Sequence, residues 1–226
     1  RDAADAYGAF VDKHPLAPSA PALSSKKIEV YAKGGFPSLV LSEKQSFVQH
    51  YGVFSPYWKQ STPETRQGYS DELKRHLVEL AQHYHAEAQA GKDPKQYMDA
   101  ARWYREYLAT FPKDKNAPLM NSLLGEVLYA AEDYQSAIEE FERTAYDYDA
   151  HENAQKAGYF ALLSYEGMLK KMPKNSPERE GWVTKENGSS LRFIKAYPSD
   201  EHVPELIENV LDSQVALNDK KVERIS

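Results

Sequence analysis

Two stretches of the chain repeat one pattern of side chains at a fixed distance. The first, "KQYMDAARWYREYLATFPKD", begins at Lys95, and the second, "EDYQSAIEEFERTAYDYD", begins at Glu132. A shift of 37 residues pairs Tyr97 with Tyr134, Ala100 with Ala137, Ala101 with Ile138, Tyr104 with Phe141, Leu108 with Ala145 and Phe111 with Tyr148. Such a period indicates an array of small helical units, each of which buries its apolar face only by stacking on a neighbour.

Paired prolines divide the chain into helices. In "DKHPLAPSAPAL", "ATFPKDKNAPLM" and "KAYPSDEHVPEL", a first proline closes one helix and a second proline, six residues later, opens the next. Proline interrupts a helix interior but is tolerated in the first turn. Together with the apolar spacing, this punctuation predicts helices at 2–13, 19–33, 36–50, 67–91, 94–111, 117–131, 134–148, 151–171, 177–196 and 201–217.

One helix pair carries residues that identify a known repeat. Leu124, Gly125 and Leu128 on its first helix are followed by Ala137 and Phe141 on its second. This spacing resembles the tetratricopeptide repeat, in which small residues sit where two helices approach and large apolar residues fill the seam beside them. Ala100 and Tyr104 repeat the second half of the pattern. The resemblance implies that these seven residues form the repeat core.

The pattern departs from the tetratricopeptide repeat at two positions, because Asn121 stands where a Trp is usual and Asp149 where a closing Pro is usual. Insertions also stretch several repeats. The resemblance nevertheless implies an all-α, tetratricopeptide-like α-solenoid of about five antiparallel helix pairs with irregular insertions, forming a single domain over 1–226. Because "RDAADAYGAFV" begins inside a helical pattern, we expect the chain to be a fragment of a longer protein.

The most conspicuous insertion, at 52–66, contains Phe54, Tyr57 and Trp58. It is longer than an ordinary turn between repeats. Two interpretations are open: the rings fill the core where the repeat register breaks, or they form a partner-binding loop.

A second candidate surface follows from the repeat itself. In tetratricopeptide arrays the first helices line the concave side, and matching the helices residue by residue places the following residues there: Tyr31, Gln82, His85, Ser122, Glu126, Tyr129, Gln155 and Tyr159. Tyr offers contact area with a polar tip, so this set would suit an extended peptide or a partner helix. The alternative is that several of these Tyr residues pack between repeats.

The composition of the chain argues against several kinds of functional site. The absence of Cys excludes disulfides, thiolate metal sites and a Cys nucleophile, and a net charge of −6 with scattered basic residues disfavours nucleic-acid binding. His76, His83 and His85 lie on one predicted helix, but no HExxH motif accompanies them, and we interpret them as helix-surface histidines. No catalytic motif or phosphate-binding loop is present. The sequence thus predicts no catalytic residues, metal or cofactor.

The sequence therefore predicts a non-catalytic scaffold that binds a protein or peptide partner in a concave groove. The style of its hinges resembles the repeat proteins of the Gram-negative envelope, namely the lipoprotein of the barrel-assembly machinery and the coordinator of the Tol-Pal system. That resemblance implies a location in the bacterial periplasm or at the periplasmic face of the outer membrane, with a cytoplasmic location as the alternative. Two other functions stay open: an accessory domain of a larger enzyme or ligand-binding protein, and a module that contacts peptidoglycan or another glycan.

Overall fold

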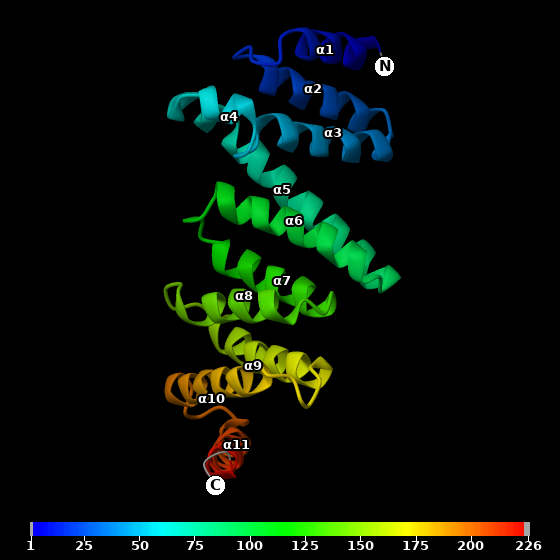
Figure 1. Ribbon diagram of the computed structural model, residues 1–226. Helices are drawn as coiled ribbons and strands as arrows, with labels where there is room; N and C mark the ends of the chain where they lie inside the picture. The colour runs from blue at the N-terminus through cyan, green and yellow to red at the C-terminus, as the bar shows by residue number, and fades with distance from the viewer. Residues whose placement is uncertain (1, 224–226) are drawn as a thin grey trace. The chain divides into compact units, whose positions relative to one another are not determined.

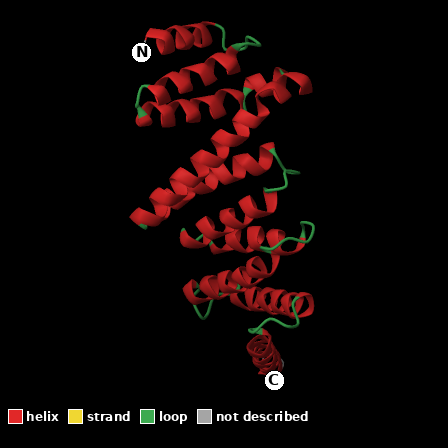
Figure 2. Ribbon diagram, turned by 180° about the vertical axis from the view of Figure 1, so that it is seen from behind, coloured by secondary structure: helices red, strands yellow, loops and turns green. Residues whose placement is uncertain are grey.

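The computed structural model describes residues 2–223 and the side chains of residues 2–219, and these residues form helices and no strand (Figures 1 and 2). Consecutive helices pack against one another in adjacent pairs. The chain divides into two compact units at Met120, inside the seventh helix. The all-helical prediction is confirmed.

The first unit contains six helices among its described residues and the start of a seventh. They are α1 (Asp2–Lys13), α2 (Ala20–Lys33), α3 (Pro37–Tyr51), α4 (Pro56–Gln60), α5 (Pro63–Gly91) and α6 (Pro94–Thr110). Helices α1, α2 and α3 pack in sequence, and α5 then packs on both α3 and α6.

Local sequence explains where these helices begin. Helices α4, α5 and α6 each carry Pro in their first turn, and the preceding residues Ser55, Thr62 and Asp93 cap them by accepting hydrogen bonds from backbone N–H groups. Between α2 and α3 the chain turns through Gly35, whose φ of 71° lies in the left-handed region that glycine adopts without strain. The short turn keeps α2 and α3 in contact.

The second unit contains the rest of α7 (Ala117–Ala130), followed by α8 (Tyr134–Tyr146), α9 (Ala154–Lys171), α10 (Arg179–Ala196) and α11 (Val203–Glu223). The seam between α7 and α8 is tight: a Cβ built on Gly125 would lie 2.6 Å from Cδ1 of Phe141. All seven residues expected in the repeat core are buried: Ala100, Tyr104, Leu124, Gly125, Leu128, Ala137 and Phe141.

Asn121 gives the same seam a polar link. Its Nδ2 donates to the backbone carbonyl of Glu140 at 2.6 Å and to Oγ1 of Thr144 at 2.9 Å. The residue is fully buried, so these bonds satisfy an amide that has no access to water. A small polar side chain therefore holds α7 to α8 at the position where the tetratricopeptide pattern usually has Trp.

Most helix ends lie within three residues of the predicted ones. The main differences are α4, a short helix inside the expected insertion, and α11, which continues to Glu223 rather than ending at 217. Within residues 2–223, no helix combines the length and apolar character that crossing a membrane requires.

Candidate functional site

The rings of the 52–66 insertion face into the first unit more than out of it. Tyr57 is buried, with its ring centroid 5.1 Å from that of Tyr51 and 5.8 Å from that of Tyr69. Burial raises the pKa of Tyr69 to about 12, so the phenols of this cluster stay neutral. Phe54 differs, since 67% of its surface is exposed.

Trp58 is half-buried at the edge of this cluster. The guanidinium of Arg66 lies 4.8 Å from its ring centroid and also donates to its backbone carbonyl at 2.7 and 3.1 Å. This contact ties α4 to α5. Burial thus favours a packing role for Tyr57 and Trp58, and leaves Phe54 as the ring that offers most of its surface to a partner.

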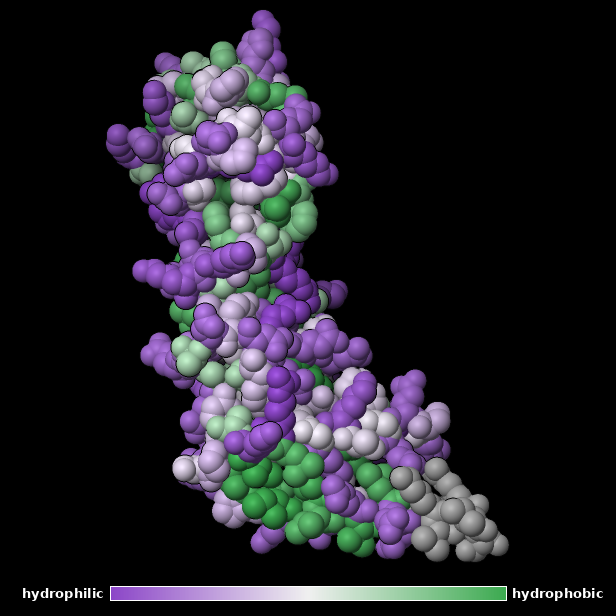
Figure 3. Space-filling model, turned by 90° about the vertical axis from the view of Figure 1, so that its left-hand side faces the viewer, coloured by the Kyte–Doolittle hydropathy of each residue, from purple (hydrophilic) through white to green (hydrophobic). Residues whose placement is uncertain are grey.

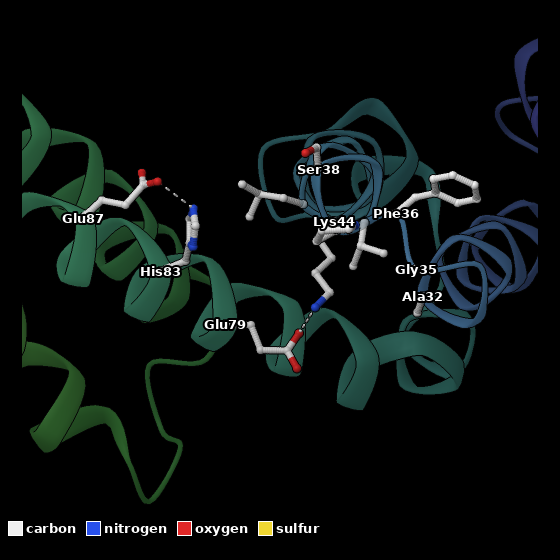
Figure 4. A pocket seen from close by; sticks show the side chains of 11 residues that line it. Ala32, Gly35, Phe36, Ser38, Lys44, Glu79, His83 and Glu87 are labelled. Atoms are coloured by element: carbon white, nitrogen blue, oxygen red, sulfur yellow. Dashed lines mark ion pairs between the residues drawn. The ribbon is translucent and has the colours of Figure 1, made fainter.

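The first unit also contains a cavity of about 730 Å³ between the start of α3 and the middle of α5 (Figure 4). Apolar side chains line one wall, from Ala32, Phe36, Pro37, Val40 and Leu41. The polar side chains of the lining already have partners, because Lys44 pairs with Glu79 at 2.8 Å and Nε2 of His83 lies 3.3 Å from a carboxylate oxygen of Glu87. The cavity has room for an apolar side chain, and no sequence motif marks it apart from the Gly turn that precedes Phe36.

His76 corrects the sequence interpretation, because it is a core residue rather than a surface histidine. Only 1% of its surface is exposed, and its ring lies 5.0 Å from that of Phe47. Its nitrogens are 3.5 Å and 3.6 Å from carboxylate oxygens of Glu72 and Glu79. Burial lowers the pKa of His76, although both carboxylates act in the opposite direction. His76 is therefore held mainly as a neutral ring.

The three residues predicted for the concave face of the first unit differ in their exposure. Tyr31 is buried, and its ring packs edge-on against Phe36. Gln82 is exposed on α5, whereas His85 is half-buried and its Nδ1 lies 3.0 Å from the hydroxyl of Tyr104. None of the three lines the cavity between α3 and α5.

In the second unit, two of the predicted residues on α7 contact side chains of α9. Glu126 on α7 accepts from Lys156 on α9 at 3.3 Å. The half-buried ring of Tyr129 on α7 meets the ring of Phe160 on α9 edge-on at 6.4 Å. Helices α7 and α9 therefore present adjacent polar and aromatic side chains. Ser122 does not contribute, because it is buried.

The predicted residues Gln155 and Tyr159 of α9 meet the turn before α11. Gln155 donates to Oδ2 of Asp200 at 2.7 Å, and Asp200 also lies 2.8 Å from Nδ1 of His202. Burial acts to raise the pKa of Asp200, but the hydrogen bonds from Gln155 and His202 hold it below its ordinary value. The ring of Tyr159 stacks on that of His202 with centroids 3.8 Å apart.

Beside this stack lies a cavity of about 260 Å³, which we name the acidic pocket. Tyr159 and His202 line it together with the carboxylates of Glu166 on α9, Glu186 on α10 and Glu205 on α11. Burial and the neighbouring Glu166 raise the pKa of Glu186, and burial together with Glu205 and other acids raises the pKa of Tyr159. Burial is the largest cause of both shifts, and the charge of neighbouring carboxylates adds to each. The pocket therefore favours a cationic group.

Sequence reasoning identified Tyr159 but missed its partners. His202 lies between the two prolines of "KAYPSDEHVPEL", a stretch that the pattern marks only as a helix boundary. The three glutamates come from three different helices, and no spacing in the sequence joins them.

The remaining findings concern metal binding and similarity to known proteins. In the described part of the chain, no cluster of three or more His, Cys, Asp or Glu residues could hold a metal ion. No protein-family model matches the sequence, and no curated protein matches it. The resemblance to the tetratricopeptide repeat is therefore supported by the residue pattern of this sequence and not by a matching family or relative.

Proposed function

We propose that this chain is a non-catalytic interaction scaffold of the tetratricopeptide type, which binds a basic segment of a partner protein, as an extended peptide or a helix, on the surface of α7, α9 and α11 in the second unit. The observation that carries the proposal is the acidic pocket, where the Tyr159–His202 stack stands beside three carboxylates. A Lys or Arg side chain entering it would gain both ion pairing and contact with an aromatic face.

The neighbouring side chains extend this surface beyond one pocket. Gln155 supplies an exposed amide next to Tyr159, and Glu126 and Tyr129 continue the polar and aromatic row onto α7. Such a row matches how tetratricopeptide scaffolds hold segments, by several modest contacts along first helices. The resemblance to envelope repeat proteins supports a location in the bacterial periplasm, at the outer membrane.

The binding proposal can be tested with synthetic peptides. Fluorescence anisotropy would compare a library of labelled peptides containing Lys and Arg with the same peptides in which Glu replaces the basic residues. We expect binding of basic members only, weakened at least tenfold by Tyr159→Ala or by Glu166→Gln with Glu205→Gln. The matched control is Glu139→Gln, which removes an exposed carboxylate on α8 and should bind as the unchanged chain does.

Circular dichroism melts would show that each variant remains folded. Equal binding of acidic and basic peptides, or full binding by the folded Tyr159→Ala variant, would overturn the proposal.

A further inference from the structure

One side of the acidic pocket is a group of polar side chains on a single face of α10. Glu186, Asn187 and Ser190 all line the pocket, and their spacing of one and four residues places them on one side of the helix. Glu186 is half-buried, and Asn187 and Ser190 are buried, whereas Glu166 and Glu205 of the same pocket are exposed. The three α10 residues are therefore the more deeply buried polar part of the pocket, and we name them the α10 floor.

The hydroxyl of Ser190 has no hydrogen-bond partner among the described residues, although only 5% of the residue is exposed. Its neighbour Ser189 donates to Oε1 of Glu142 at 2.6 Å, and the buried Ser164 on α9 donates to the backbone carbonyl of Phe160 at 2.7 Å. Buried polar groups are normally hydrogen-bonded. Ser190 is therefore a position at which a bound group would supply the missing partner.

Glu186 is the carboxylate of the pocket that is best placed to meet a bound cation. Glu166 already pairs with Lys170 on its own helix at 2.6 Å, whereas no side chain within the described residues forms a hydrogen bond or an ion pair with Glu186. Arg179 attracts Glu186 electrostatically, but its guanidinium donates to two backbone carbonyls at the end of α9. Glu186 thus offers a carboxylate with which a ligand can pair.

Apolar side chains line the pocket beside the α10 floor. Leu162 and Val210 are buried, and Leu163 and Leu206 are half-buried. A group that reaches the floor lies against these side chains, which favours an apolar stem with a polar tip. A Lys side chain has this form, because its methylenes pack along apolar surface while its ammonium keeps polar partners.

The exposed apolar side chains of α10 and α11 belong to a different surface. In Figure 3 apolar side chains gather near the C-terminal end of the described residues. Leu191, Leu211 and Val215 are exposed apolar residues of these two helices, but none of them lines the acidic pocket. Contact with a Lys stem therefore depends on the buried and half-buried apolar residues of the pocket itself.

The acceptors of the α10 floor suit an ammonium better than a guanidinium. Nδ2 of Asn187 donates to Oγ of Ser213 at 2.9 Å, which leaves the amide oxygen of Asn187 as an acceptor. The hydroxyl of Ser190 and the carboxylate of Glu186 are the other two. Three separate acceptors match the three donors of an ammonium. A guanidinium carries five donors in a rigid plane, of which a bidentate carboxylate accepts two, so burying it here would leave donors unpaired.

We propose that the acidic pocket binds a Lys side chain of the partner in preference to Arg, with the ammonium held by Glu186, Asn187 and Ser190. Stacking, which favours Arg at many sites, is restricted here, because the rings of Tyr159 and His202 lie 3.8 Å apart and cover one face of each other. This inference rests on the proposed function, since it names the residue that the basic segment places in the pocket.

Matched peptides test this preference. Each member of a labelled library of Lys-containing peptides is compared, by fluorescence anisotropy, with a twin in which Arg replaces every Lys. We expect each bound Lys peptide to bind about tenfold more tightly than its Arg twin, the effect of one hydrogen bond to a charged group. Trimethylation of the Lys side chains keeps the charge but removes the donors of the ammonium, and should weaken binding by at least as much.

Two serine variants assign the preference to the α10 floor. Ser190→Ala removes one acceptor and should weaken binding of the Lys peptides by about tenfold, with a smaller effect on their Arg twins. Ser189→Ala is the matched control, because Ser189 is similarly buried on the same helix but does not line the pocket. This control should keep the full preference for Lys. Circular dichroism melts would show that both variants remain folded.

The outcomes separate this inference from the proposed function. Equal binding of Lys peptides and their Arg twins, or an unchanged preference in the folded Ser190→Ala variant, would overturn the inference and leave the proposed function standing. If neither kind of peptide binds, the proposed function fails and the inference fails with it.

Discussion

Gly125 offers a sharp test of how closely α7 and α8 approach. A Cβ at this position would lie 2.6 Å from Cδ1 and 2.7 Å from Cε1 of Phe141, distances at which the ring must move. The ring has little room to do so, because Phe141 is 1% exposed and its ring centroid is 5.5 Å from that of Phe160. Gly125→Ala therefore forces the seam between the two helices apart.

Two effects of this substitution oppose each other. Replacing Gly by Ala inside a helix stabilises it by about 1 kcal/mol, since Ala loses less backbone entropy on folding. Overpacking a dense core destabilises by about 1 to 3 kcal/mol. The net change in the free energy of unfolding is then a loss of about 0 to 2 kcal/mol, with the crowding of Phe141 prevailing.

Gly188→Ala separates these effects, because it makes the same chemical change inside α10, where a Cβ would meet nothing within 4 Å. This control should gain up to about 1 kcal/mol. Urea unfolding of both variants, followed by circular dichroism at low protein concentration, gives the difference directly, and we expect about 1 to 3 kcal/mol. Adding Phe141→Leu to Gly125→Ala should recover part of the loss. If Gly125→Ala proves as stabilising as Gly188→Ala, the reasoning about the seam fails.

Three further predictions concern single residues. Burial lowers the pKa of His76 below its ordinary value of 6.5, so the stability that the neutral ring contributes is present above pH 6.5 and is lost as the pH falls below 6.5. His76→Leu should therefore flatten the decline of the urea midpoint between pH 7.5 and 5.5. An unchanged slope would argue against this role of His76. Asn121→Ala removes the buried amide between α7 and α8 and should cost about 1 to 3 kcal/mol in urea unfolding, so a neutral result would show that those bonds contribute little. Tyr57→Ala should destabilise by about 3 to 5 kcal/mol and exposed Phe54→Ala by less than about 0.5 kcal/mol, and calorimetry giving the reverse order would show that the insertion packs differently.

The helices could be predicted because their signals are local. Paired prolines and apolar spacing lie within a few residues of the helix ends they define. Helix α4 was missed because five residues are too few to show a helical period. Its capping signal, Ser55 followed by Pro56, was nevertheless in the sequence.

The burial of His76 could also have been predicted from the sequence of α5. Leu73, Leu77 and Leu80 are all fully buried on α5, and His76 falls within that stripe, three residues after the first and four before the last. A polar residue inside an apolar stripe is expected to be buried with partners. The acidic pocket offered no such signal, since its glutamates meet only through the packing of three helices.

Tyrosine shows why composition alone does not locate a binding site in this chain. Many of its 16 Tyr residues serve the core, where the ring packs and the hydroxyl reaches a polar group at the edge. Tyr107 donates to Asp114 at 2.8 Å, Tyr165 donates to Glu142 at 3.4 Å, and Tyr51 lies 2.9 Å from the hydroxyl of Ser24. All three rings are buried. A high Tyr content is therefore explained by helix packing.

A tyrosine is evidence for partner binding only where helix packing does not by itself explain its position. Tyr159 is half-buried, and its ring stacks on His202 at the mouth of a pocket in which three carboxylates gather. Burial raises the pKa of Glu186, and the charge of Glu166 beside it raises this pKa further, so Glu166 repels an ionised Glu186 in the folded chain. A bound cationic side chain would relieve that repulsion. The surface around Tyr159 is for this reason a better candidate for partner binding than the buried Tyr31, although one repeat register predicted both.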